Sequence, residues 1–354
     1  MQPDDDKTRE VTVLSKGTVI GHYRIVEKIG AGGMQSVERN QSLYTVTREV
    51  SLKVTVWLLV AFFGVILTAT AAEAQSQQSW DPVCQDSPTS DSLYPAENQE
   101  VAIPSSGERM NGVLFIAQGP GLHPTTILLH GFPGNERNLD LAQAVRRSGW
   151  NVLTFQYRGA WGSEGAFSFT HMLEDVTAAI DFVQGPDGAA AGCSPNQIVL
   201  IGHSLGGWAA LLTAAKDPRI LAVATIAACN MGRASRSLTD STAFAEDVAG
   251  TESSLLPLRG TSAETLTSER AAHIKDWDLL NHVPSLSAKS VLLIAGSRDE
   301  AAPVAEHHLP LLAGLESVKA SKVTSVTIDS DHSFSDKRIT LIRAVLSWLE
   351  ALQL

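Results

Sequence analysis

Six short apolar runs, separated by stretches with helical spacing, occupy the larger, C-terminal part of this sequence. The runs are Thr125–His130, Asn151–Tyr157, Gln197–His203, Leu221–Ala228, Ser290–Gly296 and Ser325–Ser330. They are continuous rather than alternating, as expected for strands that are buried on both faces of a parallel sheet. Strands that alternate with helices in this way predict an α/β fold with a doubly wound, mostly parallel sheet.

The segments between the runs predict the helices that cover this sheet. The candidates are Leu139–Ser148, His171–Val183, Leu205–Ala215 and Asp336–Leu352. Ser335 is the expected N-cap of the last helix, because a serine hydroxyl can accept a bond from a free N–H of the first turn. Ahead of the first run, Val101–Ala117 predicts a β-hairpin that turns in the sequence SSGER.

One connection is too long for a simple crossover. About 60 residues without a strand signal separate the run that ends at Ala228 from the run that begins at Ser290, and most connections in compact domains are far shorter. We predict that about residues 230–289 form an inserted, mostly helical cap. The α/β domain as a whole is expected to span residues 99–354, after a polar linker at residues 75–98.

The formal net charge of −11 lies entirely in the second part of the 354-residue chain. Residues 1–74 contain eight basic and eight acidic side chains, and the remainder contains 19 and 30. Such an acidic body argues against a nucleic-acid partner, because phosphate contacts need clustered Lys and Arg. It also disfavours an anionic substrate.

Residues 17–54 resemble the beginning of a bacterial serine/threonine protein kinase. Gly30, Gly32 and Lys53 stand where that family has its glycine-rich loop and its phosphate-binding lysine. The third glycine of the loop is replaced by Gln35, and no HRD or DFG motif follows. We interpret residues 1–53 as a non-functional remnant, a fusion scar or the product of a wrongly chosen start codon.

The apolar run Val54–Ala72 is about as long as the roughly 20 residues that span a bilayer. Basic residues precede it and acidic residues follow it, which orients the N-terminus inward. The run ends in an A-x-A pattern, Ala72-Glu73-Ala74, that signal peptidase prefers. Residues 54–74 are therefore either a cleaved signal peptide or a membrane anchor. Both interpretations place the body outside the cytoplasm, as a periplasmic, secreted or membrane-anchored protein.

The three cysteines, Cys84, Cys193 and Cys229, contain no CxxC pair, so neither a zinc site nor a thioredoxin-like motif is indicated. In an exported body, a disulfide between Cys84 and Cys193 is one possibility. Three unpaired thiols are the other.

The pattern G-x-S-x-G occurs once as Gly202-His203-Ser204-Leu205-Gly206, between an apolar strand and an apolar helix. This context is the one that a nucleophile elbow requires, and it makes Ser204 the candidate nucleophile. Glycines are needed because the turn is tight and the serine backbone is strained. The backbone N–H groups of Leu205 and of Phe132, in the HGFPG loop after the first run, are the expected oxyanion donors.

Asp299 follows the run Ser290–Gly296, and His332 follows the run Ser325–Ser330. The order Ser204, Asp299, His332 is that of an α/β-hydrolase triad, and both partners follow strands at the edge where open sheets carry their sites. His332 would accept the proton of Ser204, and Asp299 would orient the imidazole.

Six other titratable residues near these motifs are expected to have structural or surface roles. Two aspartates share the turn of His332, and two histidines are expected on a solvated helix. The six are Asp329, Asp331, Glu300, His203, His307 and His308.

With these residues in place, the body resembles the α/β-hydrolase superfamily over nearly its whole length. The segments HGFPGNERN, QYRGAWGSEGAFSF and GHSLGGWAA are most similar to dienelactone-hydrolase-like and S9 prolyl-oligopeptidase-like enzymes. The chain lacks room for the β-propeller of true prolyl oligopeptidases and has serine where dienelactone hydrolases have cysteine. The resemblance implies an acyl-enzyme mechanism that needs neither a metal nor a cofactor.

Three functions remain open from the sequence. We expect an exported carboxylesterase that acts on a small-molecule substrate, with an S9-like peptidase or amidase as the alternative. A peptidase that binds free N-termini would need an acidic group in the cap, such as Asp240, Glu246 or Asp247. The third hypothesis is a non-catalytic, membrane-tethered binding module. Contact with a membrane is expected only through residues 54–72, if they are not cleaved.

Overall fold

The computed structural model describes residues 19–20, 23–29, 34–39 and 80–352. The chain divides into two units, Met1–Gln77 and Gln78–Leu354. The described residues of the first unit form a small antiparallel sheet of β1 (Val19–Ile20), β2 (Tyr23–Ile29) and β3 (Met34–Arg39).

Several predictions for the N-terminal part fall outside the described residues. They concern the kinase-like Gly30, Gly32 and Lys53 and the apolar run at residues 54–72. The kinase resemblance and the choice between signal peptide and anchor therefore stay predictions. Within the part of the chain that is described, no helix is both long and apolar enough to cross a membrane.

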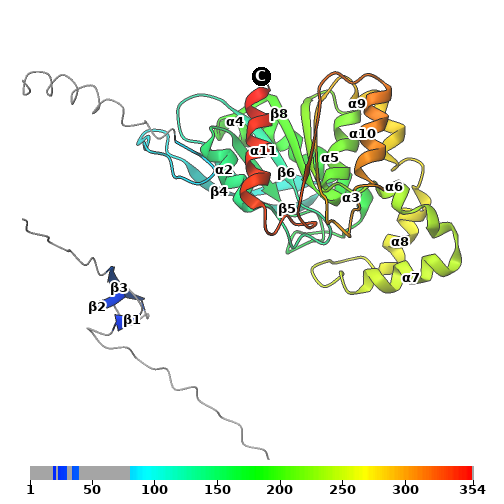
Figure 1. The fold of residues 1–354 in the computed structure, drawn as a ribbon, viewed down its shortest axis with the longest axis horizontal. Coiled ribbons are helices and arrows are strands. Elements are labelled where there is room, and N and C mark those ends of the chain that lie inside the picture. The colour runs from blue at the N-terminus through cyan, green and yellow to red at the C-terminus, as the bar shows by residue number, and fades with distance from the viewer. Residues whose placement is uncertain (1–18, 21–22, 30–33, 40–79, 353–354) are drawn as a thin grey trace, which may run out of the picture. The chain divides into compact units, whose positions relative to one another are not determined.

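The second unit is built on an eight-stranded sheet with the order β11-β10-β9-β8-β6-β7-β5-β4 (Figure 1). The strands are β4 (Glu97–Ser105), β5 (Glu108–Ile116), β6 (His123–Leu129), β7 (Asn151–Phe155), β8 (Cys193–His203), β9 (Ile220–Ile226), β10 (Ser290–Gly296) and β11 (Val323–Ile328). Neighbours from β7 to β11 are parallel, and the β4–β5 hairpin joins β7 in an antiparallel direction. The predicted doubly wound sheet and its leading hairpin are confirmed.

Helices cover both faces of this sheet, because neighbouring side chains of the central strands point to opposite faces and both must be buried. In β6, Ile127 and Leu129 join the cluster under α3 and α5, whereas Leu128 joins the cluster under α2 and α11. The helices outside the cap are α2 (Leu139–Arg147), α3 (Phe169–Gln184), α4 (Pro186–Ala190), α5 (Leu205–Lys216), α10 (His308–Ser317) and α11 (Arg338–Ala351).

The long segment between β9 and β10 is helical, as its lack of strand signals predicts. It contains α6 (Met231–Ala234), η1 (Arg236–Thr239), α7 (Ser241–Glu252), α8 (Ala263–Ala272), η2 (Leu279–His282) and α9 (Val283–Leu286). Figure 1 shows α7 and α8 standing out from the hydrolase domain. No residue of α7 is buried, so this helix contributes little to the core.

Two local predictions are wrong. The last helix begins at Arg338 rather than Asp336, and its N-cap residue Lys337 makes no side-chain capping bond. Ser335 is instead held in the preceding turn, where its N–H donates to the carboxylate of Asp331. The strand β11 is not buried on both faces, because it lies at the edge of the sheet and has several exposed side chains.

Part of the predicted linker is packed against the hydrolase domain. Val83 belongs to the core cluster under α2 and α11. Arg147 donates to the carbonyl of Pro82 at 2.6 Å, and Arg343 pairs with Asp81 at 2.9 Å. Residues 81–83 therefore extend the core rather than form a free arm.

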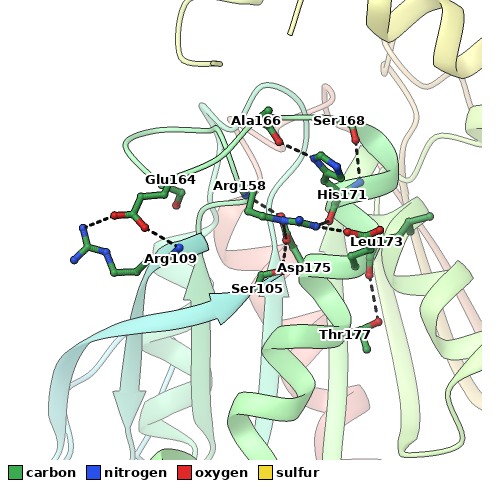
Figure 2. Close-up of polar contacts among 12 residues, drawn as sticks. Ser105, Arg109, Arg158, Glu164, Ala166, Ser168, His171, Leu173, Asp175 and Thr177 are labelled. Atoms are coloured by element: carbon green, nitrogen blue, oxygen red, sulfur yellow. Dashed lines mark hydrogen bonds and ion pairs between the residues drawn. The ribbon is translucent and has the colours of Figure 1, made fainter. Parts of the chain in front are cut away.

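A buried ion pair fixes the loop that follows β7. The guanidinium of Arg158 bonds the carboxylate of Asp175 on α3 at 2.5 Å, and the Arg158 N–H bonds the second carboxylate oxygen at 2.8 Å (Figure 2). Ser105 at the end of β4 donates to the same carboxylate at 2.7 Å. Three segments distant in sequence are thereby joined at one carboxylate, and the direction of the loop after Arg158 is set.

This arrangement predicts that Asp175→Asn is strongly destabilising. The change removes the buried counter-charge of Arg158 and leaves only the half-exposed Glu174 to pair with it, and breaking a buried ion pair typically costs about 3 kcal/mol or more in the free energy of unfolding. The matched control is Glu174→Gln, since Glu174 also contacts Arg158 but is half exposed, and such a pair contributes less than about 1 kcal/mol. Urea unfolding of both variants tests this difference. Equal losses would contradict it.

Candidate active site

Ser204 lies in the tight turn between β8 and α5, at the carboxyl end of the sheet. Its backbone has φ 54° and ψ −119°, a conformation that a residue with a side chain rarely adopts. The turn is possible because a Cβ at Gly202 would lie 2.1 Å from the carbonyl oxygen of Gly206. A Cβ at Gly206 would lie 2.3 Å from the carbonyl oxygen of Leu129. The motif glycines are thus required by close backbone approach, as the sequence predicts.

Asp299 and His332 meet after the ends of β10 and β11. The Nδ1 atom of His332 lies 2.7 Å from one carboxylate oxygen of Asp299. The other oxygen accepts from the N–H groups of Ala301 at 2.9 Å and Ala302 at 2.8 Å. Both oxygens of this carboxylate are therefore hydrogen-bonded, and its fixed orientation holds the ring of His332 in place.

Electrostatics keep Asp299 ionised. Burial of this carboxyl acts to raise its pKa, but the hydrogen bond from His332 and the bonds from the two backbone N–H groups outweigh burial and lower the pKa. A charged Asp299 accepts the Nδ1–H of His332, which leaves the other ring nitrogen, Nε2, as the candidate proton acceptor. His332 is half-buried, so this nitrogen can face a substrate.

His203 connects the nucleophile turn to the loop of His332. Its Nε2 lies 3.0 Å from the main-chain oxygen of His332, and the two rings are 4.9 Å apart. Burial lowers the pKa of His203 to about 4, so the ring is neutral at neutral pH and donates from Nε2. The residue beside Ser204 thereby positions the backbone of the candidate base. This agrees with the structural role expected for His203.

The HGFPG loop lies against Ser204 on the other side. A Cβ at Gly131 would lie 2.9 Å from the Cβ of Ser204 and 3.2 Å from the His203 carbonyl oxygen. His130 fixes the loop with an Nδ1–H bond to the carbonyl of Gly131 at 2.7 Å, and burial lowers its pKa to about 4. Within the described residues, the N–H groups of Phe132 and Leu205 donate to no protein acceptor. Both remain available for an oxyanion.

An aromatic wall adjoins this loop. The half-buried ring of Phe132 lies 5.8 Å from the rings of both Phe167 and Phe169. Phe169 in turn lies 6.1 Å from Trp277 of the cap segment. These contacts form a buried aromatic cluster between the HGFPG loop and the cap segment, and Phe132 is its half-buried member.

The cap is joined to the body at defined points. Glu269 on α8 accepts the N–H groups of Phe169 and Thr170, the first residues of α3, at 2.9 and 2.8 Å. The segment before α8 pairs with the loop after β7 through the backbone. The Phe167 N–H donates to the Arg259 carbonyl, and the Arg259 N–H donates to the Gly159 carbonyl. Glu269 has no local signal in the sequence, because only the fold brings it to a helix start 100 positions away.

A buried polar cluster holds the two ends of the cap together. The amide of Asn230 donates to Asp278 at 2.7 Å and accepts the N–H of Leu279 at 3.1 Å. The Nδ1 of His307 accepts the N–H of Asn230 at 2.9 Å. The expectation that His307 and His308 are solvated is therefore wrong. Both are buried, and His308 bonds the hydroxyl of Ser325.

The other predicted rivals take the expected roles. Asp329 is an exposed partner of Arg298, Asp331 caps its own turn, and Glu300 is exposed. Within the described part of the chain, no group of three His, Cys, Asp or Glu side chains is arranged to hold a metal ion.

The family model of the alpha/beta hydrolase family matches residues 126–338, which is more than half of the chain. The chain belongs to this family. The matched span contains Ser204, Asp299 and His332. The finer resemblance to dienelactone hydrolases and S9 enzymes stays a prediction.

Curated relatives of this alpha/beta hydrolase match over short segments. An uncharacterized protein of Mycobacterium tuberculosis is 30% identical over 132 residues, which is 37% of this chain and 46% of the relative. The quorum-quenching protein AidA of Acinetobacter baumannii is 36% identical over 28% of this chain and 34% of its own. The lysophosphatidylserine lipase ABHD12 of Gallus gallus is 31% identical over a segment that covers 24% of this chain and 21% of the lipase. The chain thus spans less than half the length of these relatives.

Solved structures match over a longer span. Est1E from Butyrivibrio proteoclasticus has a TM-score of 0.55 and 20% identity, and the match covers 71% of this chain and 97% of Est1E. The Pyrococcus furiosus esterase Pf2001 has a TM-score of 0.51 and 19% identity, and the match covers 72% of this chain and 92% of Pf2001. At these identities the likeness shows a shared fold.

The cysteines do not form the disulfide considered from the sequence. All three are free: Cys84 is exposed, Cys193 is buried at the start of β8, and Cys229 is half-buried beside Ser204. The N–H of Cys229 donates to the carbonyl of Ser204 at 3.4 Å. Burial raises the pKa of the Cys229 thiol to about 11.

These environments predict a single fast thiol. At pH 8 a group with a pKa of about 11 is a thiolate in only about one molecule per thousand, so Cys229 reacts slowly although it adjoins the site. Titration of the folded chain with a chromogenic disulfide should show one fast equivalent, which Cys84→Ser removes. The denatured chain should show three. Only one thiol in the denatured chain would contradict the free state of the cysteines.

Proposed function

We propose that this chain is a serine hydrolase that cleaves carboxylic ester bonds through an acyl-enzyme intermediate. The observation that carries the proposal is the 2.7 Å contact between His332 and a fully hydrogen-bonded Asp299, together with a serine that is held in a strained turn and whose neighbour His203 bonds the His332 carbonyl. A backbone strained in this way is typical of a functional site, because folding alone gains nothing from it.

The proposed reaction follows from these positions. His332 takes the proton of the Ser204 hydroxyl as its oxygen attacks the ester carbonyl, and Asp299 stabilises the resulting imidazolium. The N–H groups of Phe132 and Leu205 bind the oxyanion of the tetrahedral intermediate. His332 then gives the proton to the leaving alcohol. Water, activated by the same histidine, hydrolyses the acyl-serine and restores the enzyme.

The acidic residues of the cap favour an ester over a peptide with a free N-terminus. Asp240 caps the start of α7 by accepting the N–H groups of Thr242 and Ala243. Asp247 pairs with Arg270 at 2.9 Å. Glu246 is exposed on α7, a helix without buried residues. Two of the three carboxylates are thus engaged within the cap, and none is committed to holding a substrate ammonium.

Names of related proteins are consistent with such chemistry. Pf2001 is titled an esterase, and Est1E has been solved with ferulic acid bound. Ferulic acid is the ligand of Est1E, and for this chain an ester of a small molecule is the proposal. We also propose that the hydrolase unit acts outside the cytoplasm, on the basis of the apolar run and the A-x-A pattern at residues 54–74.

The first test compares the full chain with its Ser204→Ala variant. We expect a fluorophosphonate probe to label only the wild type, and hydrolysis of p-nitrophenyl acetate and butyrate to be lost in the variant. Circular dichroism and thermal unfolding of both proteins serve as the control for folding. A well-folded wild type that takes no label and turns over no ester would refute the proposal and favour the binding-module alternative.

A second test concerns the oxyanion loop. In Gly131→Ala the new methyl group would have to push the loop away from Ser204, so the Phe132 N–H would miss the oxyanion. We expect kcat for p-nitrophenyl acetate to fall on the order of 100-fold. The matched control is Gly250→Ala on α7, where an added Cβ meets nothing within 4 Å. If both variants retained full kcat, the assignment of this loop as an oxyanion donor would be wrong.

A further inference from the structure

A groove lies on the sheet face beside the oxyanion loop, beyond the start of α2. Its volume is about 540 Å³. The outer face of β4, β5 and β7 forms its floor, and loop residues form its wall. Its polar and aromatic lining includes Asn111, Gln156, Trp161, Arg137, Arg109 and Glu100.

Trp161 is unusual in both conformation and exposure. Its φ is +48°, in the left-handed region that a bulky side chain avoids, and its side chain is 41% exposed. A strained backbone conformation normally persists where contacts with the surroundings or with a ligand offset its energetic cost. Burial of the indole does not offset that cost here, because much of the ring faces solvent. The ring is held at the groove by an Nε1–H bond to the Pro133 carbonyl at 2.7 Å and lies under the Arg137 guanidinium, 5.8 Å away.

Two amide side chains lie next to each other on the floor. Gln156 is paired with Asn111 across β7 and β5, where the Gln156 N–H donates to the Asn111 carbonyl at 2.9 Å. Among the described residues, neither side-chain amide has a hydrogen-bond partner. The Oε1 of Gln156 is also shielded from solvent without a donor. The missing hydrogen bond of this shielded oxygen is costly to the protein, whereas the exposed amide of Asn111 is open to solvent or to a ligand.

The charges around the groove balance. Arg109 pairs with Glu164 at 3.3 Å, as Figure 2 shows. The lining also contains one further guanidinium, of Arg137, and one carboxylate, of Glu100. With Arg109 already paired, the remaining charges of the lining are equal in number, and a purely aliphatic ligand would leave the amides unpaired. The groove therefore suits a neutral ligand with an apolar face and several hydroxyl groups.

We propose that this groove binds a neutral, sugar-like part of the substrate. The C–H face of a pyranose or furanose ring would pack on Trp161, and its hydroxyls would bond Asn111, Gln156 and the guanidiniums. One short loop, the HGFPG loop, connects the groove to the candidate active site. Trp161 donates to the Pro133 carbonyl in this loop, and Gly131 of the same loop packs so closely on Ser204 that an added Cβ would lie 2.9 Å from the Ser204 Cβ. The inference rests on the proposed function in one respect, because it makes the substrate an acylated sugar.

Binding is tested in the full chain that carries Ser204→Ala, so that no turnover is needed. The probes are xylotriose, cellotriose and the anionic trigalacturonate, measured by isothermal titration calorimetry. We expect at least one neutral trisaccharide to bind. Asn111→Ala and Gln156→Met should each weaken that binding about three- to tenfold, as the loss of one or two hydrogen bonds predicts. Asn196→Ala, an exposed amide on β8 outside the groove, is the control and should bind as before.

Kinetics separate this inference from the proposed function. With Ser204 restored, Asn111→Ala and Gln156→Met should raise KM for acetylated xylotriose by a similar factor and leave p-nitrophenyl acetate hydrolysis unchanged. Fluorophosphonate labelling without any trisaccharide binding would overturn the groove proposal alone. Trisaccharide binding without labelling would overturn the hydrolase proposal and leave the groove. Tighter binding of trigalacturonate than of neutral sugars would overturn the neutral-ligand assignment.

Discussion

The close approach of three backbones around Ser204 is the constraint on which the rest of this site depends. The end of β6, the end of β8 and the start of α5 meet where side chains at Gly131, Gly202 and Gly206 would collide with neighbouring atoms. Ser204 takes a strained conformation there, and its hydroxyl stands at the end of the sheet. The same packing brings His203 under the carbonyl of His332. The candidate nucleophile, the candidate base and the HGFPG loop are thus held by one packed core rather than by separate loops.

The orientation of the base depends on a second, more local arrangement. Asp299 has one oxygen on two backbone N–H groups and the other on His332. Because the carboxylate cannot rotate without losing these bonds, the imidazole is held before any substrate arrives. This is the preorganisation that acyl transfer requires, since groups that need not move in the transition state stabilise it most.

The loop after β7 joins the candidate active site, the cap and the proposed sugar groove. The Arg158–Asp175 ion pair fixes its start, and its N–H and carbonyl groups pair with residues before α8 of the cap. Its side chains Phe167 and Trp161 face different surroundings, the aromatic wall in one case and the groove in the other. A change at the buried ion pair would therefore alter both surfaces at once.

The sequence alone determined the sheet, the nucleophile turn and the order of the candidate triad. Continuous apolar runs and glycine spacing are local signals, because burial on two faces and tight turns constrain the residues where they occur. It did not reveal Glu269, Arg158, the buried state of His307 or the Asn111–Gln156 pair. Each of these depends on partners far away in the chain, and only the folded backbone brings such partners together. Ser335 shows a different limit of local signals. A serine shortly before a helix predicts a cap, but the Ser335 N–H bonds the carboxylate of Asp331 in the preceding turn, and the helix begins only at Arg338.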